Sequence, residues 1–167
     1  MGMRPILLAA LLGSMAVGGC VIPAQPTQAF NDRDFQSFRG YGSAEISGHV
    51  FLDGGDDRVI SGGGYQVELT PATPYTLERY SIAEKGRSIE PPDPGLSQYT
   101  RTTVTNYMGN FVFRGLPPGQ YLLSCSLTWD VPAKFQANSV VPMTEQVLGT
   151  ATVGAGESVR VTLTNPQ

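Results

Sequence analysis

The sequence predicts an all-β protein, an antiparallel β-sandwich of two sheets with about seven strands. The 167-residue chain contains 20 glycines and 13 prolines, which suit many tight turns. Several short runs alternate apolar and polar residues with a period of two, which is typical of half-buried strands. Runs that favour a helix are scarce, and charged residues make up only 15% of the chain. We therefore expect strands and loops, and no helix.

The first strands are expected from residue 44 onward. Every second residue from Ile46 to Leu52 belongs to one face of a strand that ends at the turn 53–57, which is rich in aspartate and glycine. A second strand is expected at 65–70, where Tyr65, Val67 and Leu69 share one face. Two prolines then bend the chain, so residues 75–82 are expected to form an edge strand or a short extended run.

The remaining strands follow a long connection. Residues 83–96 are rich in proline and glycine and predict a loop of the length that is often functional or mobile. Strands are then expected at 100–106, 111–113, 121–129, 146–153 and 158–164. In the strongest of these, Cys125 lies in the middle of an apolar face, which predicts an inert core thiol rather than a reactive one.

The N-terminal residues resemble a lipoprotein signal. An apolar run follows Arg4 and ends in two glycines before Cys20, a pattern similar to the lipobox of bacterial lipoproteins. The resemblance implies that residues 1–19 are a signal peptide and that Cys20 carries lipid. A plain signal peptide and a helical anchor are the alternatives, although the run is shorter than the roughly 20 residues that cross a bilayer. Val21 in place of aspartate implies an outer-membrane location facing the periplasm.

A tether is expected between the lipid and the sandwich. We assign residues 20–42 to the lipidated cysteine and an extended, weakly structured segment, and residues 43–167 to the β-sandwich domain. Phe30, Phe35 and Phe38 interrupt this composition. They are expected to dock on the chain's own domain; the alternatives are docking on a partner, or one or two helical turns.

The stretch from Asn106 to Tyr121 carries a second resemblance. Its Gly-Asn-Phe and Leu-Pro-Pro-Gly-Gln-Tyr segments are similar to the signature of carboxypeptidase regulatory-like domains. That resemblance implies a transthyretin-like, Ig-like β-sandwich. It implies no peptidase activity, because the family's name refers to a neighbouring catalytic domain. The residues themselves suggest structural roles, with Gly109 allowing a tight turn and the following aromatics supplying core area.

Catalytic chemistry is not expected. His49 is the only histidine, and it lies on the polar side of its strand, so neither a Ser-His-Asp triad nor a histidine-rich zinc site is predicted. Asp53, Asp56 and Asp57 lack the spacing of a calcium loop and predict a solvated turn. We expect no enzyme activity, no cofactor, no metal and no catalytic residue.

Function is therefore expected to be binding. A net charge of −3 and the lack of a basic run argue against nucleic acid. The expected partners are membrane lipid through Cys20 and an envelope protein, for which the chain would be a non-catalytic accessory or scaffold. The alternative is a glycan-binding module for peptidoglycan or polysaccharide, because exposed aromatic rings stack on sugars. The candidate rings are Tyr75, Tyr80, Tyr99, Tyr107 and Trp129; for Trp129 the favoured alternative is a cap on the core.

Overall fold

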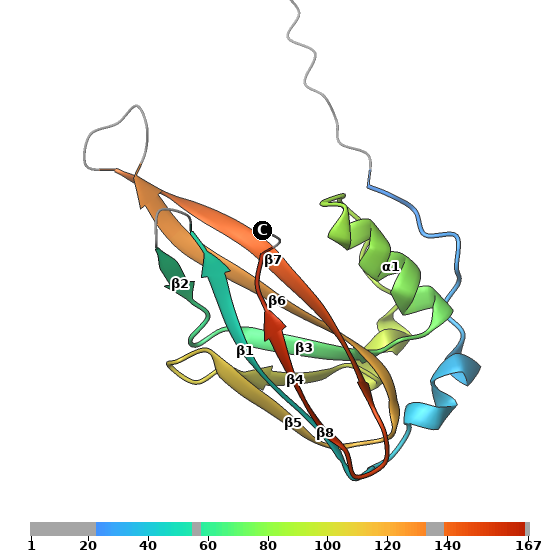
Figure 1. Cartoon of the computed structure of the whole chain (residues 1–167). Helices are drawn as coiled ribbons and strands as arrows, with labels where there is room; N and C mark the ends of the chain where they lie inside the picture. The colour runs from blue at the N-terminus through green and yellow to red at the C-terminus, as the bar shows by residue number, and fades with distance from the viewer. Residues whose placement is uncertain (1–22, 55–57, 133–138, 166–167) are drawn as a thin grey trace, which may run out of the picture.

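The protein is a two-sheet β-sandwich, as the sequence predicts. A computed structural model describes residues 23–54, 58–132 and 139–165. Eight strands form two four-stranded sheets that face each other (Figure 1). The first sheet contains β1 (Ala44–Asp53), β2 (Val59–Ser61), β5 (Asn110–Leu116) and β8 (Ser158–Leu163). The second has the order β4 (Arg101–Val104), β3 (Gln66–Pro71), β6 (Gly119–Pro132) and β7 (Val140–Val153).

Among the eight strands, pairing is antiparallel except between β1 and β8, which run parallel. The exception arises because the turn at residues 154–156 carries the chain from β7 in one sheet to β8 in the other. The parallel strands β1 and β8 are therefore not joined by a crossover within their own sheet, because the chain reaches β8 from the other sheet. The longest pairing joins β6 and β7 along fourteen residues each, from Gly119–Val153 to Pro132–Val140.

The main core lies between the sheets and confirms the predicted alternation. Residues at every second position of β1, from Ala44 to Leu52, are buried, and Cys125 is 2% exposed. Gly48 is required on this face, because a Cβ there would lie 2.4 Å from the ring of Phe111. Gly109 has a φ of +82°, which confirms the tight turn expected before β5.

One element contradicts the sequence-based expectation. Residues 74–84 form an α-helix, α1 (Pro74–Glu84), where an edge strand or extended run was expected. The helix begins at a capping box in which Thr73 and Thr76 each bond the other's backbone N–H, and Pro74 occupies the first turn. Its apolar residues do not gather into one stripe, so the helical period was not visible.

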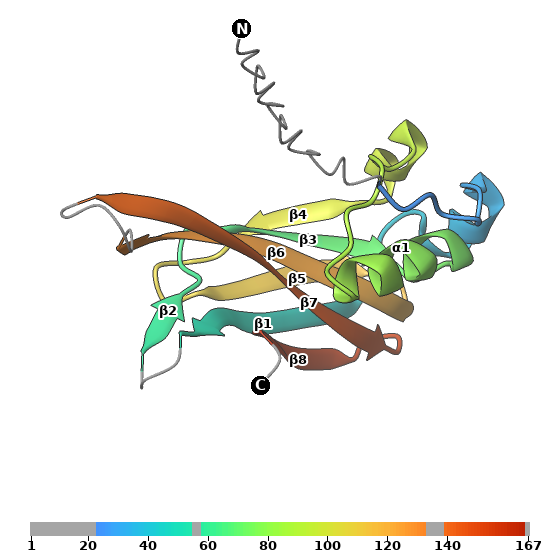
Figure 2. The same ribbon diagram turned by 90° about the horizontal axis from the view of Figure 1, so that it is seen from above.

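Helical turns and the N-terminal segment cover one side of the second sheet. Of the loop expected at 83–96, residues 83–84 belong to α1, residues 85–93 form neither a helix nor a strand, and the 3-10 helix η2 (Pro94–Gln98) begins at Pro94. A second 3-10 helix, η1 (Asp32–Phe38), lies in residues 23–39, which we call the strap. Figure 2 shows η1, η2 and α1 grouped at the same end of the sandwich.

The strap is packed, so the weakly structured tether expected over 20–42 is wrong for residues 23–39. The backbone N–H of Ala24 donates to the carbonyl of Ser88 at 2.8 Å, and Phe35 is fully buried. Phe35 forms a second apolar cluster with Tyr75 and Tyr99, and Phe30 packs against it. Phe38 packs against the main core, so the three phenylalanines dock on the chain's own domain, as expected. Of the helices in the described ranges, none has both the length and the hydropathy needed to span a bilayer.

Candidate functional site

A groove separates α1 from the outer face of the second sheet. It holds about 280 Å³ and continues into a second hollow of about 220 Å³. The two hollows share Glu68 of β3, Ser124 of β6 and Gln146 of β7. We call them together the outer-face groove. Its walls come from α1 and from residues 89–96, which lie over the sheet.

Strand register explains why polar side chains form the floor. Val67 and Cys125 are paired and point into the core, so the next pair, Glu68 and Ser124, points outward together. Gln146 is paired with Ser126, one step along the same face. The floor therefore presents a carboxylate, hydroxyls and an amide in adjacent rows.

The helix covers part of this face. Leu122 points outward from β6, beside Thr70, yet it is only 4% exposed. It lines the groove with Leu148, Ile89 and Leu96, which supply apolar surface beside the polar floor. The groove thus combines a polar base with apolar sides, which is the usual composition of a small-molecule site.

Arg79 and Tyr80 of α1 line the groove. The Arg79 guanidinium donates to the carbonyl of Glu90 at 2.6 Å and lies 5.5 Å from the centre of the Tyr75 ring. Burial, followed by the charge of Glu84, raises the pKa of Tyr80 above its ordinary value. The Tyr80 phenol therefore stays protonated at neutral pH and can both donate and accept a hydrogen bond.

The strap is attached to α1 through Glu78. Glu78 accepts hydrogen bonds from the backbone N–H groups of Thr27 and Gln28, at 2.9 and 2.7 Å, and from the Thr27 hydroxyl. These bonds lower the pKa of Glu78. The wall of the groove is thus attached to a segment about 50 residues away in the sequence.

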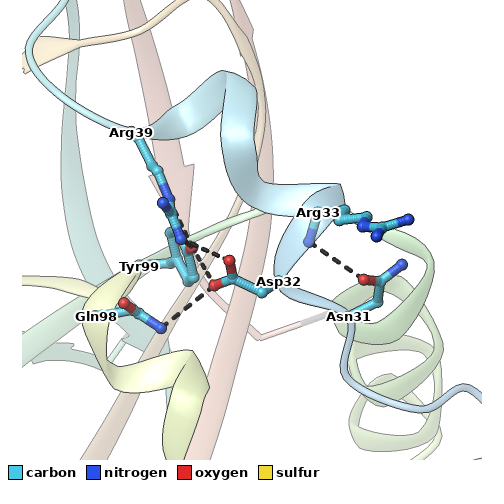
Figure 3. Close-up of polar contacts among 6 residues, drawn as sticks. All are labelled: Asn31, Asp32, Arg33, Arg39, Gln98 and Tyr99. Atoms are coloured by element: carbon cyan, nitrogen blue, oxygen red, sulfur yellow. Dashed lines mark hydrogen bonds and ion pairs between the residues drawn. The ribbon is translucent and has the colours of Figure 1, made fainter.

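A second polar contact joins the strap to the end of η2. The Tyr99 hydroxyl donates to Asp32, and Arg39 forms an ion pair with the same carboxylate at 2.6 Å (Figure 3). The hydrogen bond from Tyr99, and then the charge of Arg39, lower the pKa of Asp32. Figure 3 shows Gln98 reaching the same carboxylate. These contacts fix the strap beside residues 93–99, next to the groove wall.

The five candidate aromatic residues differ in their exposure and in their position relative to the groove. Tyr75 and Tyr99 are 6% and 8% exposed, so the expectation that they lie exposed for stacking is wrong. Tyr107 is 84% exposed but lies in the turn before β5, outside the groove lining. Trp129 is half-buried against the main core, which confirms the core-capping alternative. Tyr80 is the one among the five that lines the described groove.

Among the other predicted residues, His49 does not line the groove, and Cys125 lines the second hollow but is only 2% exposed. A ring nitrogen of His49, Nε2, lies 2.8 Å from the carbonyl oxygen of Met108. Cys125 is buried in the main core, which confirms its expected position, and burial, followed by the charge of Glu68, raises its pKa to about 11; an unreactive thiol stays a prediction. Cys20, Asp56 and Asp57 lie outside the described residues. Within the described ranges, no group of three or more histidine, cysteine or acidic side chains could hold a metal.

Sequence reasoning missed the floor of the groove. The alternation of β3 and β6 already assigns Glu68 and Ser124 to an outward face, which was the available signal. Polar residues on an outward face are ordinary, however, and nothing in the sequence pattern placed a helix over them. The covering helix turns an ordinary sheet face into a concave site.

Comparison with known proteins identifies a structural neighbour. No protein-family model matches the chain, and no curated protein matches it. The crystal structure of a protein from Pseudomonas aeruginosa, described as a "putative carbohydrate binding protein", superposes with a TM-score of 0.69 at 26% sequence identity. The match covers 83% of this chain and 99% of that one. The chain is therefore similar in fold to nearly the whole of that protein.

Proposed function

We propose that this chain is a carbohydrate-binding β-sandwich and that the outer-face groove is where it holds the sugar. The structural neighbour carries this proposal, since its likeness spans 83% of the chain at 26% identity. It favours the glycan-binding alternative over the accessory-subunit hypothesis. The composition of the groove supports the same conclusion.

The groove offers what a sugar needs. Sugar hydroxyls are both donors and acceptors, and the side chains of Glu68, Ser124 and Gln146 provide carboxylate, hydroxyl and amide partners along one sheet face. The more apolar C–H face of a sugar ring needs apolar or aromatic contacts, which Leu122 and Tyr80 provide. Because strands form the floor, these partners are held on a rigid element.

Isothermal titration calorimetry of the full chain with a panel of soluble oligosaccharides tests the proposal. The panel covers fragments of peptidoglycan, cellulose, chitin and galactan. We expect at least one of these to bind, and we expect Gln146→Ala to weaken that binding about tenfold through loss of a polar contact. Tryptophan fluorescence is a poor reporter here, because Trp129 packs on the main core rather than in the groove.

Gln120→Ala is the matched control. Gln120 is also an exposed glutamine on the second sheet, but it does not line the groove. This variant should bind as the unchanged chain does. Failure of every oligosaccharide to bind, or equal weakening by the two variants, would count against the groove as a sugar site.

Anchoring through Cys20 forms a separate part of the proposal. It rests on the sequence pattern around Cys20, including the glycines before it, which resembles a lipobox. Cys20→Ser should abolish incorporation of a radiolabelled fatty acid and move the chain out of the outer-membrane fraction; normal labelling would contradict the assignment. Three further points stay predictions. They are a scaffold role beside an envelope protein, the absence of enzyme activity, and membership of the carboxypeptidase regulatory-like domains. In-cell crosslinking tests the first of these.

A further inference from the structure

We infer that the outer-face groove sorts sugars by charge, preferring those with a free amino group over neutral ones and neutral ones over anionic ones, and that Glu68 sets this order. The inference rests on the proposed function, because it names the class of sugar for the same groove. It follows from the position of one carboxylate and from the arrangement of charges around it.

Glu68 occupies the centre of the floor. It lines both hollows, so a ligand in either one lies beside it. Strands flank it on both sides, with Thr102 of β4 and Ser124 of β6 as its register partners. A ligand cannot fill the groove without meeting the Glu68 carboxylate.

No cation neutralises this carboxylate in the described part of the chain. The ion pairs there join Arg39 to Asp32 and Arg114 to Glu45, both away from the groove. The hydrogen bond that Glu68 accepts comes from the neutral Gln66 amide, at 3.4 Å. Its negative charge is therefore available to a ligand that brings a positive charge or hydroxyl donors.

Arg79 carries the positive charge of the groove lining, and its hydrogen-bond acceptor and ring partner are uncharged. Its guanidinium is engaged at the groove wall, by the Glu90 carbonyl and by the face of the Tyr75 ring. The Glu90 side chain accepts from Gln25, and Glu84 is close enough to Tyr80 to influence its hydroxyl, so acidic groups accompany Arg79 along the wall. The order therefore depends on position, because Glu68 lies on the floor and lines both hollows, whereas Arg79 lines only the first.

The consequence for a ligand is graded. A protonated amine gains Coulomb attraction from Glu68, a neutral sugar donates hydroxyl hydrogen bonds to it, and a uronate meets repulsion. One unit of charge at contact distance changes affinity by about fivefold in bulk water and by more near a protein surface, so a tenfold step lies at the low end of that range. We therefore expect about a tenfold step between neighbouring members of such a series at low ionic strength.

Trios of sugars that share a backbone and differ in the charge of one substituent on each ring test this order. For both gluco- and galacto-configured backbones, the probes are the amino-sugar tetramer, the neutral tetramer and the uronate tetramer. Calorimetry at pH 6 and about 20 mM salt keeps the amine protonated and limits screening. We expect the amino-sugar tetramer to bind about a hundredfold more tightly than the uronate, and the difference to shrink at high salt.

Glu68→Gln should collapse the order to within about threefold while binding of the neutral tetramer is retained, because the amide keeps an acceptor oxygen. Asp130→Asn is the control; it makes the same change in net charge on an exposed part of β6 outside the groove lining and should leave the order intact. Equal binding of the three charge classes, or an order that survives Glu68→Gln, overturns the charge inference and leaves sugar binding standing. No binding by any probe overturns the inference, and failure of the wider oligosaccharide panel as well removes the proposed function.

Discussion

The sandwich and the layer packed on it are built in different ways. The sandwich buries aliphatic side chains from regular alternation, so its core residues recur at every second position along β1, β3 and β6. The layer, which consists of the strap, α1 and η2, has a core of only three buried rings in the described structure. Those rings come from three segments that are distant in sequence. The difference indicates that the groove has a rigid floor and a less stable wall.

The stability of the layer depends on contacts among a few side chains. The rings of Phe35 and Tyr99 are stacked with centres 4.6 Å apart, and Phe30 lies 5.2 Å from Phe35. Around them, the hydrogen bonds to Glu78 and the ion pair between Arg39 and Asp32 are solvent-exposed. Exposed ion pairs and hydrogen bonds add little stability, so the layer should open before the sandwich does.

The largest expected effect lies in the sandwich core. Phe113→Ala should lower the free energy of unfolding by about 3–5 kcal/mol, because the ring is 5% exposed and its loss leaves a cavity between the sheets. Urea denaturation followed by circular dichroism measures this loss. A decrease below about 1 kcal/mol would contradict the assignment of Phe113 to a cooperative core.

Phe35→Ala should have a smaller global effect but a clear local one. The ring is fully buried in the layer, so its removal should lower the free energy of local opening by up to about 3 kcal/mol. Hydrogen exchange should then lose protection in residues 24–39 and in α1 while β1 and β6 keep theirs. Uniform loss of protection would show that layer and sandwich form one cooperative unit.

Acid should separate the two regions. The folded pKa values of Glu78 and Asp32 are lowered, so their contribution to strap docking is complete above their ordinary values near 4 and is lost as pH falls through the lower folded values. NMR shifts of the Thr27 and Gln28 amides should therefore move to solvent-exposed values in this range, before the sandwich unfolds. Glu78→Gln should weaken docking already at pH 7. Unchanged amide shifts down to pH 2 would contradict this account.

The smallest effect concerns the thiol of Cys125. Its pKa is raised to about 11, so less than about one thiol in a hundred is ionised at pH 8 and alkylation in the native state should be very slow. Peptide mapping after iodoacetamide treatment separates Cys125 from Cys20. Rapid labelling of Cys125 in the folded protein would show that the sandwich opens far more readily than the layer comparison implies.

Sequence patterns predicted the sandwich but not the layer, and the reason is physical. A strand reveals itself by local alternation, which is why the inward faces of β1 and β6 could be read directly. The helix α1 contains tyrosine, threonine and isoleucine, which favour strands, and its start depends on the capping box at Thr73. Its place over Leu122 depends on contacts between distant segments, which no local pattern contains.

The same limit applies to the groove. Glu68 and Ser124 could be assigned to an outward face from alternation alone. Their meeting with Gln146 depends on the register between β6 and β7. Tyr80 was predicted for its ring, but Tyr75 and Tyr99 have the same chemistry and are buried. Residue type identified the candidates, and packing decided among them.

The contact between Ala24 and Ser88 also limits the distance between the groove and residue 20. A polypeptide extends by at most about 3.5 Å per residue, so the roughly four residues from Cys20 to Ala24 reach no farther than about 14 Å. Ile89, which follows Ser88, is part of the groove lining. The link to whatever is attached at residue 20, whether an acyl chain, a bead or a fused protein, is thus short. The groove therefore stays close to the surface to which residue 20 is attached, and it can reach only polymer that lies near that surface.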